Sequence, residues 1–182
     1  MQLKIATTDT QLTKIHQLYE EAFPASEKKP FEFILQKRET GSFELLEIVD
    51  EEENFCGLAI MMLYKELALL DYFAIAPECR GKGVGGKALK ALQEMYAAGK
   101  FMLEIESTVG LGAEFPEEEK VLRLRRKAFY LQNGMRPMDF MVDLFGVEME
   151  ILVYGESVTF EEYYSVLQST VPSHLIQHVR LL

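Results

Sequence analysis

The 182-residue sequence lacks tryptophan and contains only two cysteines, Cys56 and Cys79. Two cysteines do not make the disulfide framework on which small secreted domains depend, so a reducing environment is favoured. No apolar run approaches the roughly 20 residues that a membrane-spanning helix needs. Residues 1–5 also lack the apolar stretch of a signal peptide. We therefore expect a cytoplasmic protein that has no membrane partner.

Basic residues are scarce as well. The chain has 19 Lys and Arg against 29 Asp and Glu, which gives a net charge of −10 and a pI near 4.9. This deficit argues against general nucleic-acid binding, which requires a basic surface, and it favours a cationic partner such as an amine. Nine of the 19 basic residues nevertheless fall in windows 80–90 and 120–127, which contain no Asp or Glu. These windows indicate either a bound anion or two solvated helix faces.

Hydrophobic periodicity and turn residues divide the chain into strand and helix candidates. The expected strands are residues 2–6, 43–49, 55–63, 67–75, 101–106, 138–145 and 147–154. The expected helices are residues 12–22, 31–38, 83–98 and 121–132, and a final helix begins at the capping-box pattern of Thr159 and Glu162. No linker, repeat or low-complexity tract separates these elements. We therefore expect residues 1–182 to form one α+β domain.

The central sheet of this domain is expected to be mixed and mostly antiparallel, with helices against its faces. Residues 67–106 should form a parallel β-loop-α-β unit with a right-handed crossover. The loop of this unit is the glycine-rich run Arg80-Gly81-Lys82-Gly83-Val84-Gly85-Gly86, and it fits three patterns. The context of the run separates them.

The first two patterns are nucleotide sites. Gly81-x-Gly83-x-x-Gly86 fits a dinucleotide fingerprint, with Glu106 twenty residues further on. Four residues separate this run from its strand, however, and further β-α units are missing. The run also fits a nucleotide P-loop, but Ala88 stands where a metal-binding hydroxyl is required.

The third pattern is an anion site at the N-terminus of a helix, where backbone N–H groups and the helix dipole attract negative charge. Glycines at 81, 83, 85 and 86 allow a phosphate to approach the backbone without interference from a Cβ atom. Arg80, Lys82, Lys87 and Lys90 add positive charge around the loop. The spacing Arg80-x-x-Gly83-x-Gly85 resembles that of the acyl-CoA loop in the GNAT superfamily.

The stretch from Asp71 to Gly85 resembles the central strand and loop of the GNAT superfamily of acyl-CoA-dependent N-acyltransferases. The resemblance implies the GNAT fold, with acetyl-CoA as cosubstrate and no metal. It implies that the main chain of Phe73, Ala74 and Ile75 pairs with the pantetheine arm. It also implies that the pyrophosphate is held by Arg80, Gly81, Lys82, Gly83, Val84, Gly85 and Gly86.

Two further stretches resemble the family. The stretch from Ala128 to Met135 contains Tyr130, where the family commonly has a tyrosine that protonates the departing thiolate. Leu103-Glu104-Ile105-Glu106 places two glutamates on one face of a strand. The resemblance implies that Glu104, or else Glu106, is the general base, and Asp71 is a reserve candidate.

Arg123 and Arg126 lie three residues apart on one face of the helix candidate at 121–132. They can contact the CoA phosphates, with Arg126 as the expected ligand, or form salt bridges with the acids of residues 114–119. His174 and His178 are four residues apart but lack a nearby carboxylate ligand, so no metal site is expected.

The leading hypothesis is direct transfer of an acetyl group from acetyl-CoA to a primary amine of a small molecule or peptide, within a ternary complex. The alternatives are a non-catalytic acyl-CoA-binding module and a nucleotide-dependent protein. The identity of the amine, the length of the acyl chain and a homodimer through the strands at 138–154 are left open.

Overall fold

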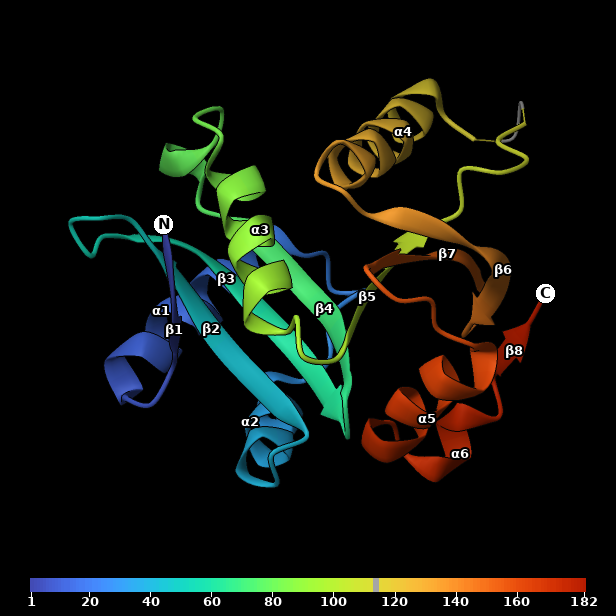
Figure 1. Ribbon diagram of the computed structural model, residues 1–182, viewed down its shortest axis with the longest axis horizontal. Helices are drawn as coiled ribbons and strands as arrows, with labels where there is room; N and C mark the ends of the chain where they lie inside the picture. The colour runs from blue at the N-terminus through green and yellow to red at the C-terminus, as the bar shows by residue number, and fades with distance from the viewer. Residues whose placement is uncertain (113–114) are drawn as a thin grey trace.

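The computed structural model describes residues 1–112 and 115–182, in which eight strands form one continuous sheet (Figure 1). The strand order is β1-β2-β3-β4-β5-β7-β6-β8. Among these described strands, β4 and β5 form the one parallel pair. The expected mixed, mostly antiparallel sheet is therefore confirmed. No helix in the two described stretches is long and apolar enough to cross a membrane.

The N-terminal part contributes β1 (Gln2–Ile5), α1 (Asp9–Ala22), α2 (Phe31–Glu39), β2 (Phe43–Val49), β3 (Phe55–Tyr64) and β4 (Leu67–Ile75). Thr8 begins α1 through a capping box with Gln11. The four strands lie side by side in chain order, each antiparallel to the next. β2 and β4 have the bounds that their apolar patterns predict.

The middle of the chain contains the 3-10 helix η1 (Pro77–Cys79), α3 (Val84–Met95), β5 (Lys100–Glu106) and α4 (Glu117–Gln132). α3 ends three residues earlier than expected. Gly99 has a packing role, because a Cβ atom there would lie 2.1 Å from the carbonyl oxygen of Glu66. α4 begins four residues earlier than expected, because Pro116 and three following glutamates suit a helix N-terminus.

The C-terminal part contributes β6 (Arg136–Leu144), β7 (Val147–Tyr154), α5 (Phe160–Thr170), α6 (Ser173–Ile176) and β8 (Val179–Leu181). A capping box between Thr159 and Glu162 begins α5, as predicted. The prediction that this is the final helix was wrong, because α6 follows it, and β8 was not predicted. β8 has three residues, too few to show a periodic pattern, and it forms by pairing with β6.

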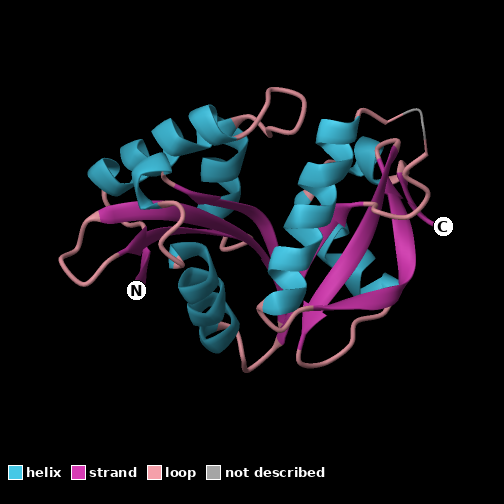
Figure 2. Ribbon diagram, turned by 90° about the horizontal axis from the view of Figure 1, so that it is seen from above, coloured by secondary structure: helices cyan, strands magenta, loops and turns pink. Residues whose placement is uncertain are grey.

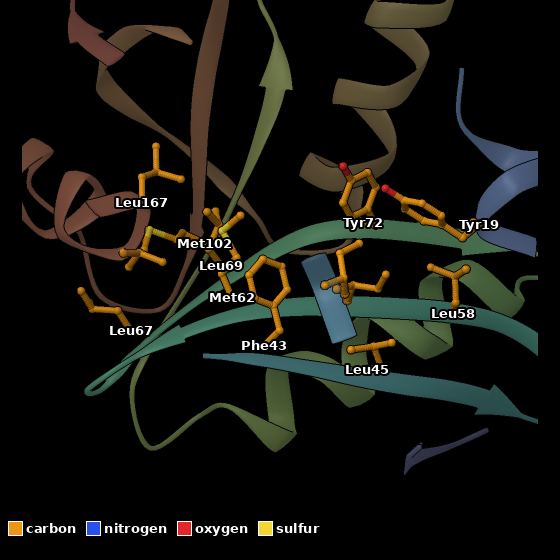
Figure 3. Packing of buried hydrophobic residues seen from close by; sticks show 14 of the residues in the cluster. Tyr19, Phe43, Leu45, Leu58, Met62, Leu67, Leu69, Tyr72, Met102 and Leu167 are labelled. Carbon is orange, nitrogen blue, oxygen red and sulfur yellow. The ribbon is translucent and has the colours of Figure 1, made fainter. Parts of the chain in front are cut away.

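Helices cover both faces of the sheet (Figure 2). α1, α2 and α5 pack against one face, in a core that includes Tyr19, Phe43 and Leu167 (Figure 3). α3 and α4 lie against the other face, where Leu89 and Leu92 of α3 are fully buried. Both cores rest directly on β4 and β5, the strands that carry the predicted site.

Candidate functional site

The parallel strands β4 and β5 pair over four residues and then separate. Leu67–Leu70 pairs with Lys100–Leu103, and the next residue of β4, Asp71, forms a bulge against β3. Beyond the bulge, β4 pairs with β3 and β5 pairs with β7, and no pairing between β4 and β5 is found in the described chain. The separation is visible in Figure 1, and a cavity of about 670 Å³ lies there.

The cavity brings together the three predicted catalytic residues and four of the eleven predicted CoA-binding residues. Its walls include both separating strands, α4, the loop between α1 and α2, and the β6–β7 hairpin. The predicted residues that line it are Phe73, Ala74, Arg80, Glu104, Glu106, Arg126 and Tyr130. Ile75 and loop residues 81–86 are not among the described residues that line it. The loop is joined to the cavity by Arg80, whose Nε donates a hydrogen bond of 2.9 Å to the Ile75 carbonyl oxygen.

The glycine-rich loop leads into an uncapped helix N-terminus. Gly83 is the N-cap residue of α3 with φ of 73°, and Gly81 has φ of 75°, so both adopt the left-handed conformation that favours glycine. No described side chain caps the first turn of α3, which leaves its N–H groups available. Lys82 donates to the Glu78 carbonyl oxygen at 3.0 Å and stays beside the loop. These are the features of the anion site that the sequence predicts.

Gly85 and Gly86 have a packing role that the sequence did not reveal. A Cβ atom at Gly86 would lie 2.7 Å from Oδ1 of Asn133, and one at Gly85 would lie 3.4 Å from the Phe129 ring. Because Phe129 and Asn133 are at the C-terminal end of α4, these glycines allow α3 and α4 to approach each other. Open space surrounds a Cβ atom at residue 81 or 83 instead.

Glu104 has a strongly shifted acidity. Burial, together with the charge of Asp71, raises the pKa of its carboxyl to about 7, although Lys29 and Tyr163 act in the opposite direction. Asp71 itself forms an ion pair with Lys29, whose Nζ lies 2.8 and 2.9 Å from the two carboxylate oxygens. A carboxyl that titrates near pH 7 can both accept and release a proton at physiological pH.

α4 places Tyr130 at the wall of the cavity. Its ring packs against that of Phe129, with centroids 5.2 Å apart. Burial raises the pKa of the phenol to about 12, although the charge of Arg126 opposes this shift. The hydroxyl is therefore protonated at neutral pH and can act as a proton donor.

Glu106 lines the same cavity but pairs with two arginines of α4. Its oxygens lie 3.1 Å from Arg123 and 3.0 Å from Arg126, and Arg123 also contacts Glu119 at 2.5 Å. Arg123 therefore forms a salt bridge with one of the acids of residues 114–119, which is the alternative to phosphate binding given above. Both arginines also pair with Glu106, which was not predicted. Glu114, another acid considered for this role, lies outside the described residues.

Sequence reasoning missed Lys29, which lies in the polar break between α1 and α2. The Tyr72 hydroxyl accepts a hydrogen bond of 3.0 Å from the Lys29 N–H, and the Tyr19 hydroxyl donates one of 2.9 Å to its carbonyl oxygen. No spacing in the sequence connects this lysine with Asp71, 42 residues away. The sequence feature that could have identified Lys29 is the pair of lysines directly before Pro30 in an otherwise acidic chain.

Comparison with known proteins agrees with this geometry. The sequence profile of the Acetyltransferase (GNAT) family matches residues 12–113, more than half of the chain. The chain belongs to the GNAT acetyltransferase family. The matched residues of this GNAT protein include the glycine-rich loop and Glu104, and they end before α4 and Tyr130. No curated protein matches the chain in sequence.

Solved structures share the fold of this GNAT chain. A Bacteroides thetaiotaomicron protein assigned to the GNAT family aligns with a TM-score of 0.75 and 21% identity, over 96% of this chain and 98% of its own. The Vibrio cholerae spermidine N-acetyltransferase in complex with CoA and spermine aligns with a TM-score of 0.63 and 15% identity, over 89% and 96%. A dodecameric structure of the spermidine N-acetyltransferase from Vibrio cholerae gives 0.60 and 16%, over 84% and 92%. The predicted GNAT fold is confirmed.

Proposed function

We propose that this GNAT protein transfers an acetyl group from acetyl-CoA to the primary amine of a small molecule or peptide. The observation that carries the proposal is the cavity between β4 and β5, which is lined by a carboxyl with a pKa of about 7, a half-buried tyrosine and Arg80 of the glycine-rich loop. Acyl transfer from a thioester to an amine requires an anion site, a proton acceptor and a proton donor. The glycine-rich loop, Glu104 and Tyr130 are the candidates for these three groups.

Acetyl-CoA is the proposed cosubstrate because both ends of a binding site are available. The loop from Arg80 to Gly86 offers backbone N–H groups for the pyrophosphate. The edge of β4 from Phe73 to Ile75 has no strand partner on the β5 side among the described residues, so its backbone can pair with the amides of pantetheine. Arg126 lines the cavity and is exposed enough to contact a phosphate as well as Glu106.

Glu104 is the proposed general base, acting directly or through water. An amine must lose a proton before or during attack on the thioester, and a base with a pKa of about 7 is suited to this at neutral pH. Tyr130 is the proposed acid that protonates the departing thiolate. Glu106 is less suited to accept a proton because two arginines stabilise its charge. We assign it instead to holding α4, and therefore Tyr130, in position.

The acceptor is proposed to be cationic in its resting form, which fits the net charge of −10. The Vibrio cholerae enzyme of the same fold was solved with spermine, a polyamine. We also propose that residues 1–182 act as a single domain in the cytoplasm. A homodimer stays a proposal that measurement of the mass in solution would test.

A thiol-release assay with acetyl-CoA and a panel of amines tests the proposed reaction. We expect release that depends on an amine, and a loss of about 10²–10⁴-fold in kcat/KM for Glu104→Gln, as for removal of a general base. Glu106→Gln is the matched control on the same strand, and its loss should be smaller. Equal losses for the two variants would contradict the assignment of Glu104.

Ligand-induced shifts in melting temperature separate the alternatives. We expect CoA to raise the melting temperature, and NAD or ATP to have no effect. Tight binding of CoA without thiol release for any amine would favour a non-catalytic acyl-CoA-binding module. A shift with NAD or ATP but not with CoA would overturn the proposed function.

A further inference from the structure

Lys29 presents a primary amine at the wall of the cavity between β4 and β5. Its Nζ lies 2.8 and 2.9 Å from the Asp71 oxygens and 5.1 Å from the centre of the Tyr72 ring. Asp71 is the bulge residue at which β4 and β5 separate. The amine of Lys29 is therefore at the point where the cavity begins, and Lys29 is among the residues that line it.

The backbone of Lys29 is fixed by two tyrosines that belong to different elements. Tyr72 of β4 accepts a hydrogen bond from the Lys29 N–H and donates one of 2.8 Å to the Glu27 carbonyl oxygen. Tyr19 of α1 donates to the Lys29 carbonyl oxygen. The two tyrosine rings are in edge contact, with centroids 4.8 Å apart (Figure 3). The loop is therefore anchored so that the side chain of Lys29 projects into the cavity.

The residues proposed for amine acetylation line the same cavity as this lysine. Glu104 of β5 and Tyr130 of α4 are both among its lining residues. The charges of Lys29 and Asp71 influence the ionisation of Glu104 in opposite directions. Holding a nucleophile and its reaction partner in one cavity raises the rate of their reaction strongly. An amine in this position is a candidate substrate as well as a structural ion-pair partner.

We infer that Lys29 is itself an acetyl acceptor, which the protein modifies from acetyl-CoA when no external amine is bound. The Lys29 ammonium loses a proton to a cavity carboxylate, and its nitrogen forms an amide bond with the acetyl carbonyl carbon. The C–S bond of the thioester breaks, and the CoA thiolate takes a proton from Tyr130 or from water. The nitrogen loses its second proton to give the neutral amide, and that proton replaces the one given to the thiolate. The products are Nε-acetyl-Lys29 and free CoA. This inference rests on the proposed function.

The modification is expected to occur once per chain. Acetylation removes the positive charge of Lys29, so Asp71 loses its counter-ion and the acetyl group occupies part of the cavity. An external cationic amine that binds to Asp71 should displace Lys29 and slow the modification. Self-acetylation and acetylation of an external amine therefore compete for one position.

Lys100 offers a matched comparison with Lys29. Its side chain is 22% exposed and pairs with Glu162 at 2.5 Å, whereas that of Lys29 is 27% exposed and pairs with Asp71. Lys100 is not among the described residues that line the cavity. If Lys29 served only as an ion-pair partner, we would expect the two lysines to be acetylated at equal rates.

The test incubates the full chain with isotope-labelled acetyl-CoA and follows the occupancy of each lysine by peptide mass spectrometry. We expect Lys29 to be acetylated at least about tenfold faster than Lys100, as proximity requires. Excess CoA should slow acetylation at Lys29 and leave unaffected the exposed Lys65, which is not among the described residues that line the cavity. Occupancy at Lys29 that is no higher than at Lys100, or that is insensitive to CoA, would overturn the inference.

The variant Lys29→Arg keeps the charge but removes the amine that would be acetylated. It should fold, as its melting temperature would show, and its total incorporation of label from acetyl-CoA should fall by the share that Lys29 carries in the wild type. Turnover of an external amine without labelling of Lys29 in the wild type would overturn the inference alone. Absence of CoA binding and of thiol release with every amine would overturn the proposed function too.

Discussion

Helices α3 and α4 lie against the same face of the sheet, but they are attached to it differently. α3 buries Ala88, Leu89 and Leu92 in the core. None of the sixteen residues of α4 is buried to the same degree. α4 is held by ion pairs to Glu106 of β5 and Glu150 of β7, and by partial burial of the aromatic pair at its C-terminal end.

This difference predicts that the positions of α3 and α4 respond differently to salt and pH. The helix that follows the glycine-rich loop is fixed by apolar burial, which depends little on salt or pH. The helix that carries Tyr130 is fixed by charges, so its position responds to both. Its apolar residues Val121 and Leu124 face solvent. The proposed anion site is therefore the part fixed by apolar packing, and the proposed acid is the part whose position depends on charges.

The largest expected effect comes from the buried side of α3. Leu92→Ala removes a fully buried side chain and leaves a cavity, which should lower the free energy of unfolding by about 2–5 kcal/mol. Leu124→Ala on α4 removes the same group at a position that is 53% exposed, and it should change stability by less than about 0.5 kcal/mol. Urea unfolding at pH 7 measures both. Equal losses would mean that the exposed face of α4 is covered in solution.

The next effect comes from the ion pair between Lys127 and Glu150, whose atoms lie 2.5 Å apart. Lys127→Met leaves a carboxylate that is 5% exposed without its cation, and it should cost about 1–3 kcal/mol at pH 7. Lys90→Met, which removes an exposed lysine from α3, is the control and should cost less than about 0.5 kcal/mol.

The cost of Lys127→Met should also depend on pH. Burial acts to raise the pKa of Glu150, but hydrogen bonds from Lys127 and Thr108 outweigh it and hold the pKa below its ordinary value of 4.5. Because the folded pKa is lowered, the ion pair stabilises the protein above about pH 4.5, and this contribution is lost as the pH falls. The difference between variant and wild type should therefore shrink from pH 7 to pH 4. A constant difference would contradict the role given to Glu150.

Glu104 of β5 should cost stability when it ionises. Its folded pKa of about 7 is above the ordinary value of 4.5, so the stability present below pH 4.5 is lost as the pH rises through 7. Glu104→Gln should therefore be more stable than the wild type at pH 8, on the order of 1–3 kcal/mol, and similar at pH 4. Thermal unfolding at the two pH values tests this, and a variant that is less stable at pH 8 would show that the carboxylate is well solvated.

The smallest effect should come from Glu106, which joins β5 to α4. Its partners are partly exposed, so Glu106→Gln should cost about 0.5–1 kcal/mol at low ionic strength. This cost should largely disappear in 1 M NaCl, where charges are screened over about 3 Å. The cost of Leu92→Ala should persist there. A salt-independent loss for Glu106→Gln would mean that ion pairs do not hold α4.

Local signals predicted much of this molecule. Capping boxes at Thr8 and Thr159 begin α1 and α5, and β2 and β4 have the predicted bounds. Such features depend on residues within a few positions of one another. The glycine-rich loop and the glutamates of β5 are equally local, which is why candidate residues for both ends of the cavity could be named.

The remaining features depend on contacts between distant segments. The proximity of Lys29 to Asp71 arises from the fold of the loop between α1 and α2. The pairing of Glu106 with arginines of α4 and the packing of Gly86 against Asn133 require the arrangement of two helices. β8 forms because the edge of β6 is available. No periodicity or motif in the sequence encodes these contacts directly.

Hydrogen–deuterium exchange of the wild-type protein with and without acetyl-CoA tests the central claim most directly, because it locates the bound cosubstrate on the chain. We predict slower exchange in three places when acetyl-CoA is saturating: the β4 edge from Phe73 to Ile75, the loop from Arg80 to Gly86, and α4 around Tyr130. The interior of α3 should be protected already in the free protein. Saturable binding with protection confined to segments outside the β4–β5 cavity would contradict the account.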